Sequence, residues 1–241
     1  MEYDKNYLKW KNSPEKFWEK CANYISWHKK WDNVLKKNGK YEYSWFDGAE
    51  LNTCYNCLDR HVKDGKAEKC AVIYDSPVTK TKKFLSYQNL LQKVNAFAAG
   101  LINHGVKKGD RVIIYLPMIP EVIIAMLGCA RIGAIHSVVF GGFAAKELAS
   151  RIDDAQPKLI ISASCGIENT KVINYKIILD EAISLSTHKP DNQIIVQRKE
   201  LICELNKVGD VDWKEFINQE NLVQCIPVKA SDPLYILYTS G

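Results

Sequence analysis

Two glycine-bearing turns have the residue types that phosphate binding requires. Gly141 and Gly142, in "VVFGGFAAKEL", follow a predicted strand and precede a predicted helix, while Thr239, Ser240 and Gly241 follow the apolar run "LYILY". Glycines let a ligand approach the backbone closely, and hydroxyls and free amides can bind phosphate oxygens. Each turn is consistent with a phosphate contact, and each is equally consistent with an ordinary surface turn.

Two lysines follow a later predicted strand, at the end where an anionic ligand would meet them. Lys171 and Lys176 lie in "CGIENTKVINYK", after the run "KLIISAS". A lysine ammonium can bind phosphate as a point charge, although solvated surface lysines are the commoner case. Phosphate contact and simple solvation both remain open for this pair.

Cysteine spacing offers one candidate metal site. Cys54 and Cys57 form a CxxC pair in "CYNCLDRH", with His61 and Cys70 downstream. A structural zinc site needs a second ligand pair at characteristic spacing, so packing under a surface segment is the favoured interpretation, and no metal site is predicted. We expect the cysteines to be reduced thiols. Three of them lie in apolar stretches: Cys129, Cys203 and Cys225.

No catalytic nucleophile can be assigned. The G-x-S-x-G motif is absent, and no recognisable motif pairs a serine or cysteine with a histidine and a carboxylate. We expect His61 to lie in a salt-bridged structural cluster with Asp59 and Arg60, and His136 to be a satisfied core residue. These residues therefore predict no catalytic side chain.

The composition is that of an ordinary globular protein. Hydrophobic residues make up 46% and charged residues 25% of the 241 residues, and no apolar run approaches the thickness of a bilayer. The net charge of +5 comes mostly from lysines dispersed among acids, so neither nucleic acid nor membrane is expected as a partner. Because the first residues are unlike a signal or transit peptide, we expect a cytoplasmic location, with the mitochondrial matrix as the alternative.

The elements that must position these residues alternate between strand and helix. A hairpin is predicted from "AVIYDS" and "KFLS", followed by a helix that Ser86 caps and Gly105 stops. Strands are predicted at "RVIIYLP", "IHSVVFG", "KLIISAS", "NQIIVQRK" and "LYILY", with helices between the first four. This βαβ repetition predicts an α/β fold: a mainly parallel sheet with helices on both faces and ligands at the carboxyl ends of its strands.

The N-terminal segment differs from the rest of the chain. Its first 45 residues carry five of the six tryptophans in a lysine-rich background. Trp18, Ile25, Trp27 and Trp31 follow an approximate helical stripe, which predicts a helical, tryptophan-rich cap docked on the α/β body. We place a boundary near residue 78, which divides the chain into residues 1–78 and 79–241.

Taken in order, these segments resemble the acyl-CoA synthetases that form an acyl-adenylate, within them the acetyl- and propionyl-CoA synthetase group. The likeness is carried by "YSWFDGAELNTCYNCLDRH", "LSYQNLLQKVNAFAAGL", "KKGDRVIIYLPMIPEVIIAMLGCARIGAIHSVVFGGF" and "DPLYILYTSG". "FAAKELASRIDDAQPKLIISASCGIE" and "VINYKIILDEA" are more similar to the propionyl-CoA synthetase branch. The resemblance implies an N-terminal cap region over 1–78 and an incomplete AMP-binding (adenylation) domain over 79–241.

The resemblance also implies a two-step reaction. A short acid, propionate or acetate, attacks the α-phosphate of ATP with Mg²⁺ to give acyl-AMP and pyrophosphate, and the CoA thiol then displaces AMP. The implied ATP phosphate contacts are Thr239, Ser240 and Gly241. The implied CoA contacts are Gly141, Gly142 and Lys171. Acetyl-CoA synthetases usually have an "RAGR"-like segment where this chain has "ENTK", so Glu168 disfavours a CoA contact at its position.

In that family the "YTSG" loop continues, and adenine-, ribose- and acid-binding motifs follow, with a mobile domain that carries a catalytic lysine. We therefore expect the 241 residues alone to be inactive. We also expect the strand over 234–238 to expose an apolar open edge that favours self-association. The alternative is a non-catalytic product that binds full-length subunits or another partner. An oxidoreductase is disfavoured because the glycine fingerprint is incomplete.

Overall fold

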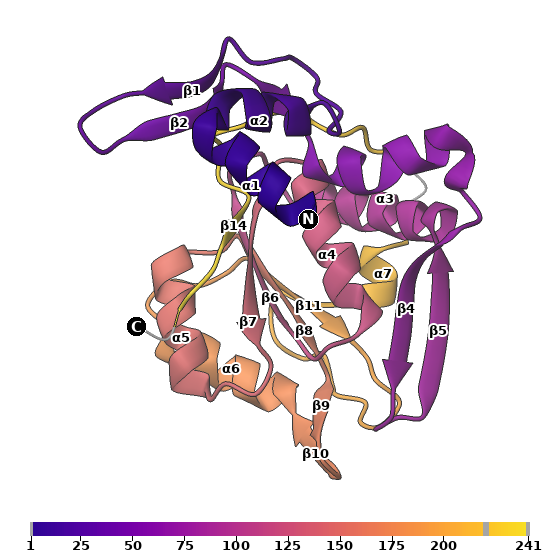
Figure 1. Cartoon of the computed structure of the whole chain (residues 1–241). Coiled ribbons are helices and arrows are strands. Elements are labelled where there is room, and N and C mark those ends of the chain that lie inside the picture. Colours follow the sequence, from indigo (N-terminus) through magenta and orange to yellow (C-terminus); the bar gives the residue numbers. More distant parts are fainter. Residues whose placement is uncertain (1, 219–221, 240–241) are drawn as a thin grey trace.

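The fold is built around a parallel β-sheet. The computed structural model describes residues 2–218 and 222–239. Within them, six strands form one sheet in the order β12-β11-β8-β6-β7-β14, and every pairing is parallel. The strands are β6 (Arg111–Leu116), β7 (Ile135–Phe140), β8 (Leu159–Ala163), β11 (Asn192–Val196), β12 (Asp210–Asp212) and β14 (Tyr235–Ile236). The predicted parallel α/β architecture is confirmed (Figure 1).

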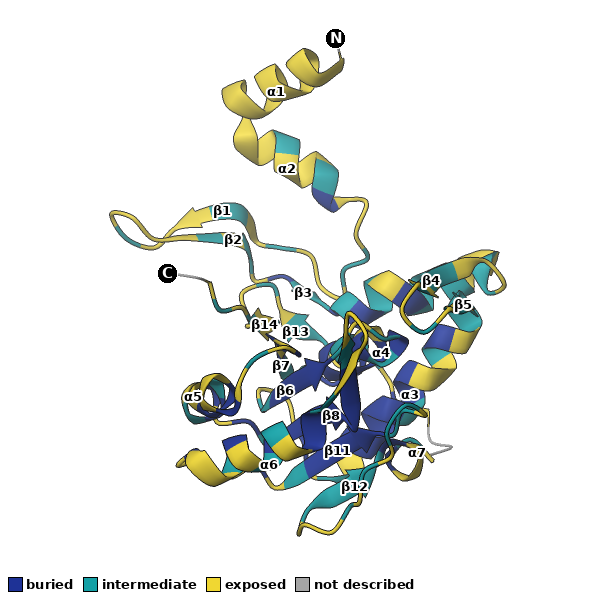
Figure 2. Ribbon diagram, turned by 90° about the horizontal axis from the view of Figure 1, so that it is seen from below, coloured by how far each residue is buried: buried dark blue, intermediate teal, exposed yellow. Residues whose placement is uncertain are grey.

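Helices cover both faces of this sheet, as the alternating pattern predicts. They are α3 (Tyr87–Asn103), α4 (Pro120–Arg131), α5 (Ala145–Ala155), α6 (Tyr175–Leu185) and α7 (Trp213–Phe216). Helices α3, α4 and α7 share one core with the sheet, and α5 and α6 share the other (Figure 2). The Ser86 hydroxyl accepts a hydrogen bond from the amide of Asn89 at 3.2 Å, and Gly105 adopts φ +77°, which confirms both predicted ends of α3. None of the described helices is long and apolar enough to span a bilayer.

Strand β6 shows why its sequence is continuously apolar. Val112 and Ile114 pack into the α3/α4 core, whereas Ile113 and Tyr115 pack into the α5/α6 core. Successive side chains of a strand point to opposite faces, so a strand covered on both sides buries every residue. The run "VIIYL" therefore spans both cores of the molecule.

Several hairpins surround the sheet. The predicted one is confirmed as β4 (Cys70–Ser76) and β5 (Thr81–Ser86), paired antiparallel. Three antiparallel pairs were not predicted: β1 (Asn33–Lys37) with β2 (Tyr43–Asp47), β9 (Cys165–Glu168) with β10 (Lys171–Asn174), and β3 (Glu50–Leu51) with β13 (Val228–Lys229). The turn of β9–β10 contains Asn169 at φ +54°, a left-handed conformation that asparagine tolerates.

The N-terminal helices project from this body (Figure 2). They are α1 (Glu2–Asn12), which buries no residue, and α2 (Pro14–Ala22), which buries Ala22 alone. Helices do precede the sheet, but the helix predicted to carry the tryptophan stripe ends at Ala22, before its last three members. Trp27 and Trp31 lie outside any helix because their rings pack on Phe46 of β2, with centroids 5.3 and 5.2 Å away. The spacing of these two tryptophans therefore reflects aromatic packing on the β1–β2 hairpin and not a helix.

Candidate functional site

The carboxyl ends of β6, β7 and β8 form the edge where a ligand is expected. The helix after β6 covers one face of the sheet, while the helices after β7 and β8 cover the other (Figure 2). Neighbouring connections that leave to opposite faces open a crevice outside the strand ends. The β9–β10 hairpin extends from this edge, at the bottom of Figure 1.

The Gly141–Gly142 turn lies at this edge, directly after β7. An ideal Cβ on Gly141 would lie 2.5 Å from the hydroxyl oxygen of Tyr175, and one on Gly142 would lie 2.6 Å from the Phe140 ring and 2.9 Å from a Glu168 carboxylate oxygen. Packing therefore requires glycine at 141, against the buried Tyr175, whereas the side chains that face Gly142 are exposed and can move aside. Gly141 is buried, whereas Gly142 is exposed, so ligand contact stays a prediction that concerns Gly142 first.

Helix α5 begins immediately after this turn and offers amide donors. Its N-cap residue is Ala144, whose side chain cannot accept a hydrogen bond from the first-turn amides. Uncapped amides and the positive end of the helix dipole favour an anion at this position. The turn and the helix start together form a backbone surface suited to phosphate oxygens.

Two stacked tyrosines hold the edge together, and sequence reasoning missed them. The rings of Tyr115 and Tyr175 lie 5.0 Å apart, and the Tyr115 hydroxyl donates a hydrogen bond to the carbonyl of Phe143 at 3.0 Å. Burial raises the pKa of both hydroxyls, and the nearby Glu168 carboxylate adds to the rise, so both stay protonated near neutral pH. The sequence does place both tyrosines near the ligand edge, since Tyr115 is near the end of an apolar strand and Tyr175 is the first residue of a helix.

Glu168 and Lys171 face each other across the β9–β10 hairpin. They are paired in its register, and both are exposed. Glu168 also lies beside Gly142, as the 2.9 Å approach shows. A phosphate that reaches Lys171 would therefore also meet a carboxylate, which weakens the attraction of this part of the edge for anions.

Lys176, the second predicted phosphate lysine, has a structural role instead. Its side chain is 4% exposed, and its ammonium contacts Asp180 at 2.5 Å and Asp210 at 3.1 Å. Burial disfavours the ammonium, but the hydrogen bonds to the two aspartates outweigh it and raise the pKa of Lys176. Neither phosphate contact nor simple solvation holds for Lys176, because this lysine is buried and ties α6 to β12.

Thr239 is exposed and follows β14. The preceding residue, Tyr238, donates a hydrogen bond from its hydroxyl to Asp154 of α5 at 2.6 Å. The guanidinium of Arg151 lies 5.1 Å from the Tyr238 ring and 4.6 Å from the Phe143 ring. These contacts hold the segment before Thr239 next to the turn after β7. The other two predicted phosphate contacts, Ser240 and Gly241, lie outside the described residues.

His136 is buried, but it is not the satisfied core residue that was predicted. Its Nδ1 has no hydrogen-bond partner among the described residues, and its ring lies 5.8 Å from that of Tyr235. Burial lowers the pKa of His136 to about 4, so the imidazole is neutral at pH 7. The neighbouring edge strand β14 covers it with an aromatic ring instead of a polar group.

The predicted salt-bridged cluster around His61 is also wrong. Asp59 forms a two-pronged ion pair with Arg131 of α4, with both N–O distances 2.9 Å. Arg60 instead donates to the carbonyl of Tyr24 at 2.7 Å, and the His61 ring packs against Tyr87 at 5.0 Å. Asp59 ends the π-helix η1 (Tyr55–Asp59), and it is partly buried against α4.

The two cysteines of the CxxC pair lie at the start of η1: Cys54 precedes its first residue, and Cys57 lies within it. Cys54 is buried, while Cys57 and Cys70 are exposed. The ligand-type atoms that do come together, within 4.8 Å of one another, belong to Cys54, Asp59 and Cys225. Cys225 packs against the α3/α4 core, as its apolar stretch predicts, but its sulfur also lies 3.6 Å from an Asp59 carboxylate oxygen.

Comparison with known protein families finds two matches that together cover almost the whole chain. Residues 58–241 match the family described as AMP-binding enzyme. Residues 3–57 match the family described as acetyl-coenzyme A synthetase N-terminus. The first match includes every strand of the parallel sheet.

Individual relatives agree with the family matches. The acyl-CoA synthetase short-chain family member 3, mitochondrial, of Bos taurus is 48% identical over 241 residues, all of this chain and 35% of the relative. An acetyl-coenzyme A synthetase of Leptospira biflexa is 42% identical, over all of this chain and 38% of its own. The solved acetoacetyl-CoA synthetase of Streptomyces lividans shares the fold, with a TM-score of 0.86 at 22% identity over 97% of this chain and 35% of that one. The chain thus spans about a third of the length of these proteins.

Proposed function

This chain belongs to the AMP-binding enzyme family, and from that premise we propose that it forms the N-terminal part of an AMP-forming acid–CoA ligase for a short carboxylic acid. The observation that carries the proposal is the sheet edge where the Gly141–Gly142 turn, the Lys171 hairpin and the approach to Thr239 lie. The proposed substrates are ATP, CoA and a short acid, propionate first and acetate as the alternative. The printed names of the relatives support a short-chain acid.

Each group at the edge has a role in this proposal. The Thr239 hydroxyl, with Ser240 and Gly241, binds ATP phosphate oxygens, and Lys171 binds a phosphate of CoA. Gly142 and the uncapped start of α5 supply the surface on which CoA lies. Mg²⁺ would enter with ATP, bound by phosphate oxygens of the nucleotide. The metal offsets charge on the transferring phosphoryl group, while the described residues bind and orient the substrates.

The preference for propionate rests on the similarity of residues 143–168 and 172–182 to the propionyl-CoA synthetase branch, and the β9–β10 hairpin between them departs from the acetyl branch. Its turn reads "ENTK", with Glu168 and Lys171 opposite each other, where acetyl-CoA synthetases usually have an arginine-rich segment. Lysine in place of arginine binds a phosphate without the two-pronged geometry, and Glu168 adds repulsion. CoA is therefore proposed to be held less tightly at this hairpin than in a protein with arginines there.

Three further parts of the proposal concern the whole protein. Residues 1–78 form the N-terminal cap region and 79–241 part of the adenylation domain. The 241 residues alone do not complete the ligation, because they correspond to about a third of each relative. The location is the cytoplasm, with the mitochondrial matrix as the alternative that the names of several relatives support.

The test is a set of binding and turnover measurements on the purified 241-residue chain. Isothermal titration with CoA should show binding that Lys171→Ala weakens roughly 10- to 150-fold, the value of one charge-assisted hydrogen bond. Lys5→Ala, on the projecting helix α1, is the matched control and should leave the affinity unchanged. Equal effects of both substitutions, or binding of NAD in place of CoA, would contradict the proposal. Release of pyrophosphate that depends on propionate would contradict the proposed inactivity.

An exposed sheet edge supports a second candidate, association with full-length subunits. Tyr235 and Leu237 near β14 and Phe140 of β7 are each more than half exposed, which is unusual for large apolar side chains beside a sheet. An unpaired edge strand readily accepts another strand or surface. Capture of the full-length enzyme by the tagged chain, lost on Leu237→Lys, would support it. Unchanged capture by that variant would contradict a role for this edge.

A further inference from the structure

A cluster of two thiols, one carboxylate and one guanidinium lies at the C-terminal end of α4, whose first residue, Pro120, is at the ligand edge. Cys54 stands at the start of η1, and Cys225 lies on the segment that leads into β13. The Arg131 guanidinium lies 3.4 Å from the Cys54 sulfur and forms the two-pronged pair with Asp59. The two sulfurs and the carboxylate lie within 4.8 Å of one another, although they come from distant parts of the chain.

The two thiols differ in their readiness to ionise. The hydrogen bond from Cys225 lowers the pKa of the Cys54 thiol against the effect of burial, and the positive charge of Arg131 lowers it further. The same hydrogen bond, together with burial, raises the pKa of Cys225. The Cys225 proton has two acceptors in reach, the Cys54 sulfur and the Asp59 carboxylate at 3.6 Å. A thiol whose ionisation is favoured, next to a second thiol, is the arrangement on which disulfide exchange depends.

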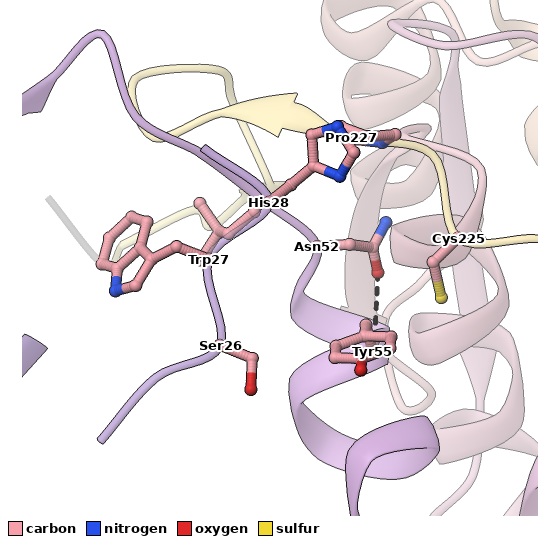
Figure 3. Close-up of a pocket in the computed structure, with 8 residues that line it drawn as sticks. Ser26, Trp27, His28, Asn52, Tyr55, Cys225 and Pro227 are labelled. Atoms are coloured by element: carbon pink, nitrogen blue, oxygen red, sulfur yellow. Dashed lines mark hydrogen bonds between the residues drawn. The ribbon is translucent and has the colours of Figure 1, made fainter. Parts of the chain in front are cut away.

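Only one of the two sulfurs borders open space. Cys54 is fully buried, whereas Cys225 lines a cavity of about 320 Å³ that opens between the segment over 26–28 and the start of η1 (Figure 3). Asn52 and Tyr55 line the same cavity. A small molecule that enters it meets Cys225 first, and Cys54 lies behind.

The cluster is less suited to a metal ion. The Arg131 guanidinium already supplies a positive charge to Asp59 and Cys54, and its Nε donates to the carbonyl of Val223 at 2.6 Å. A divalent cation among the same ligands would lie next to this fixed positive charge and be repelled by it. The geometry therefore favours chemistry between the two sulfurs.

We propose that Cys54 and Cys225 form a reversible disulfide by exchange with a low-molecular-weight disulfide that enters the cavity. The Asp59 carboxylate, 3.6 Å from the Cys225 sulfur, accepts the Cys225 proton as that sulfur attacks one sulfur of the reagent, a mixed disulfide forms, and the first reagent thiolate leaves and takes up this proton. The Cys54 thiolate then attacks the Cys225 sulfur, which forms the Cys54–Cys225 bond and releases the second reagent thiolate. The two cysteines are oxidised, and the reagent disulfide is reduced to one thiol and one thiolate.

The bridge would fasten the segment that leads toward the proposed phosphate contacts. That segment is already held beside the cluster, because the Asn52 amide donates to the carbonyl of Ile226 at 2.8 Å and the amide of Ile226 donates to the carbonyl of Arg131 at 2.9 Å. The two sulfurs, which lie within 4.8 Å of each other, must approach to the bonded separation of about 2.05 Å. The inference does not depend on the proposed function.

The experiment titrates the reduced 241-residue chain with 2-hydroxyethyl disulfide and its thiol in defined ratios. Remaining thiols are alkylated, and the digest is read by mass spectrometry. The expected result is a linked pair of peptides that contain Cys54 and Cys225, with the other cysteines alkylated, and full reversal by excess thiol. A Cys54–Cys57 bridge, or adducts confined to the exposed Cys57 and Cys70, would overturn the proposal.

Variants separate the two steps. Cys54→Ser should trap the mixed disulfide on Cys225, because the resolving sulfur is missing, whereas Cys57→Ser should form the bridge as the unchanged chain does. Absence of the adduct from folded Cys54→Ser, judged by its circular dichroism, would overturn the order of attack. Because the bridge itself is measured on the unchanged chain, a variant that fails to fold leaves that part of the test intact.

Discussion

Asp59→Asn should be among the most damaging single substitutions of a polar residue in this protein. The change removes the negative charge opposite Arg131, whose side chain is only 2% exposed, while it keeps the size of the side chain. The guanidinium would keep its bonds to the carbonyl of Val223 and the sulfur of Cys54, but it would lose both 2.9 Å contacts to a carboxylate. A buried cation would then remain without its principal counter-charge.

The magnitude follows from this burial. Removal of one partner of a buried ion pair costs about 3–5 kcal/mol, because the other charge stays away from water. For a chain of this length, such a loss lowers the melting temperature by roughly 6–20 °C. The double variant Asp59→Asn with Arg131→Met removes both charges, so it should lose less stability than the sum of the two single variants.

Urea unfolding followed by circular dichroism measures these free energies. The matched control is Asp47→Asn, which breaks the exposed pair with Lys36 at 3.0 Å and should change the free energy of unfolding by less than about 1 kcal/mol. If Asp59→Asn changes it no more than this control does, burial of the pair is not what stabilises this part of the fold. Additive losses in the double variant would equally refute the reasoning.

Substitutions at three other sites test separate features, the last of them against a control. The pKa of His136 is about 4 in the folded state, below its unfolded value, so the contribution of this residue to stability is lost as pH falls from about 6.5 to 4. His136→Gln should therefore reduce the difference between the free energies of unfolding at pH 7 and pH 4, measured in urea, by about 3 kcal/mol. Gly166→Ala would place a Cβ 2.3 Å from a tyrosine ring, and thermal unfolding should show that the free energy of unfolding falls by roughly 1–3 kcal/mol. No such loss is expected if the site has room for a methyl group. Lys176→Met leaves the buried Asp210 without its cationic partner and should lower the free energy of unfolding in urea by about 3–5 kcal/mol. The control, Lys171→Ala on the exposed hairpin, should change that free energy by less than about 0.5 kcal/mol. A larger loss for Lys171→Ala than for Lys176→Met would contradict the structural role given to Lys176.

The parallel sheet could be predicted because its signals are local. An apolar run such as that of β6 must be buried on both faces, and Ser86 and Gly105 mark the ends of the next helix within a few residues of its pattern. The N-terminal tryptophans were harder, since aromatic residues at helical spacing can also gather around one strand residue. Trp27 and Trp31 both pack on Phe46, and this shared contact cannot be predicted from their spacing in the sequence.

The polar clusters were missed because their members are distant in the chain. Asp59 has Arg60 and His61 as sequence neighbours, which suggested a local cluster, yet its partner is Arg131. The true companion of Cys54 is likewise Cys225 and not the nearby Cys57 of its motif. Short-range patterns identify which residue types are unusual, but the fold decides which of them meet.

The contacts of Arg131 also bear on how fast the native state is lost. Its bonds join α4 to η1 and to the carbonyl of Val223, so they form only after long stretches of chain have been closed into loops. Loop closure costs entropy before such contacts repay it, and non-local contacts of this kind tend to form after the folding barrier is crossed. We therefore expect Asp59→Asn to raise the rate of unfolding more than it lowers the rate of folding.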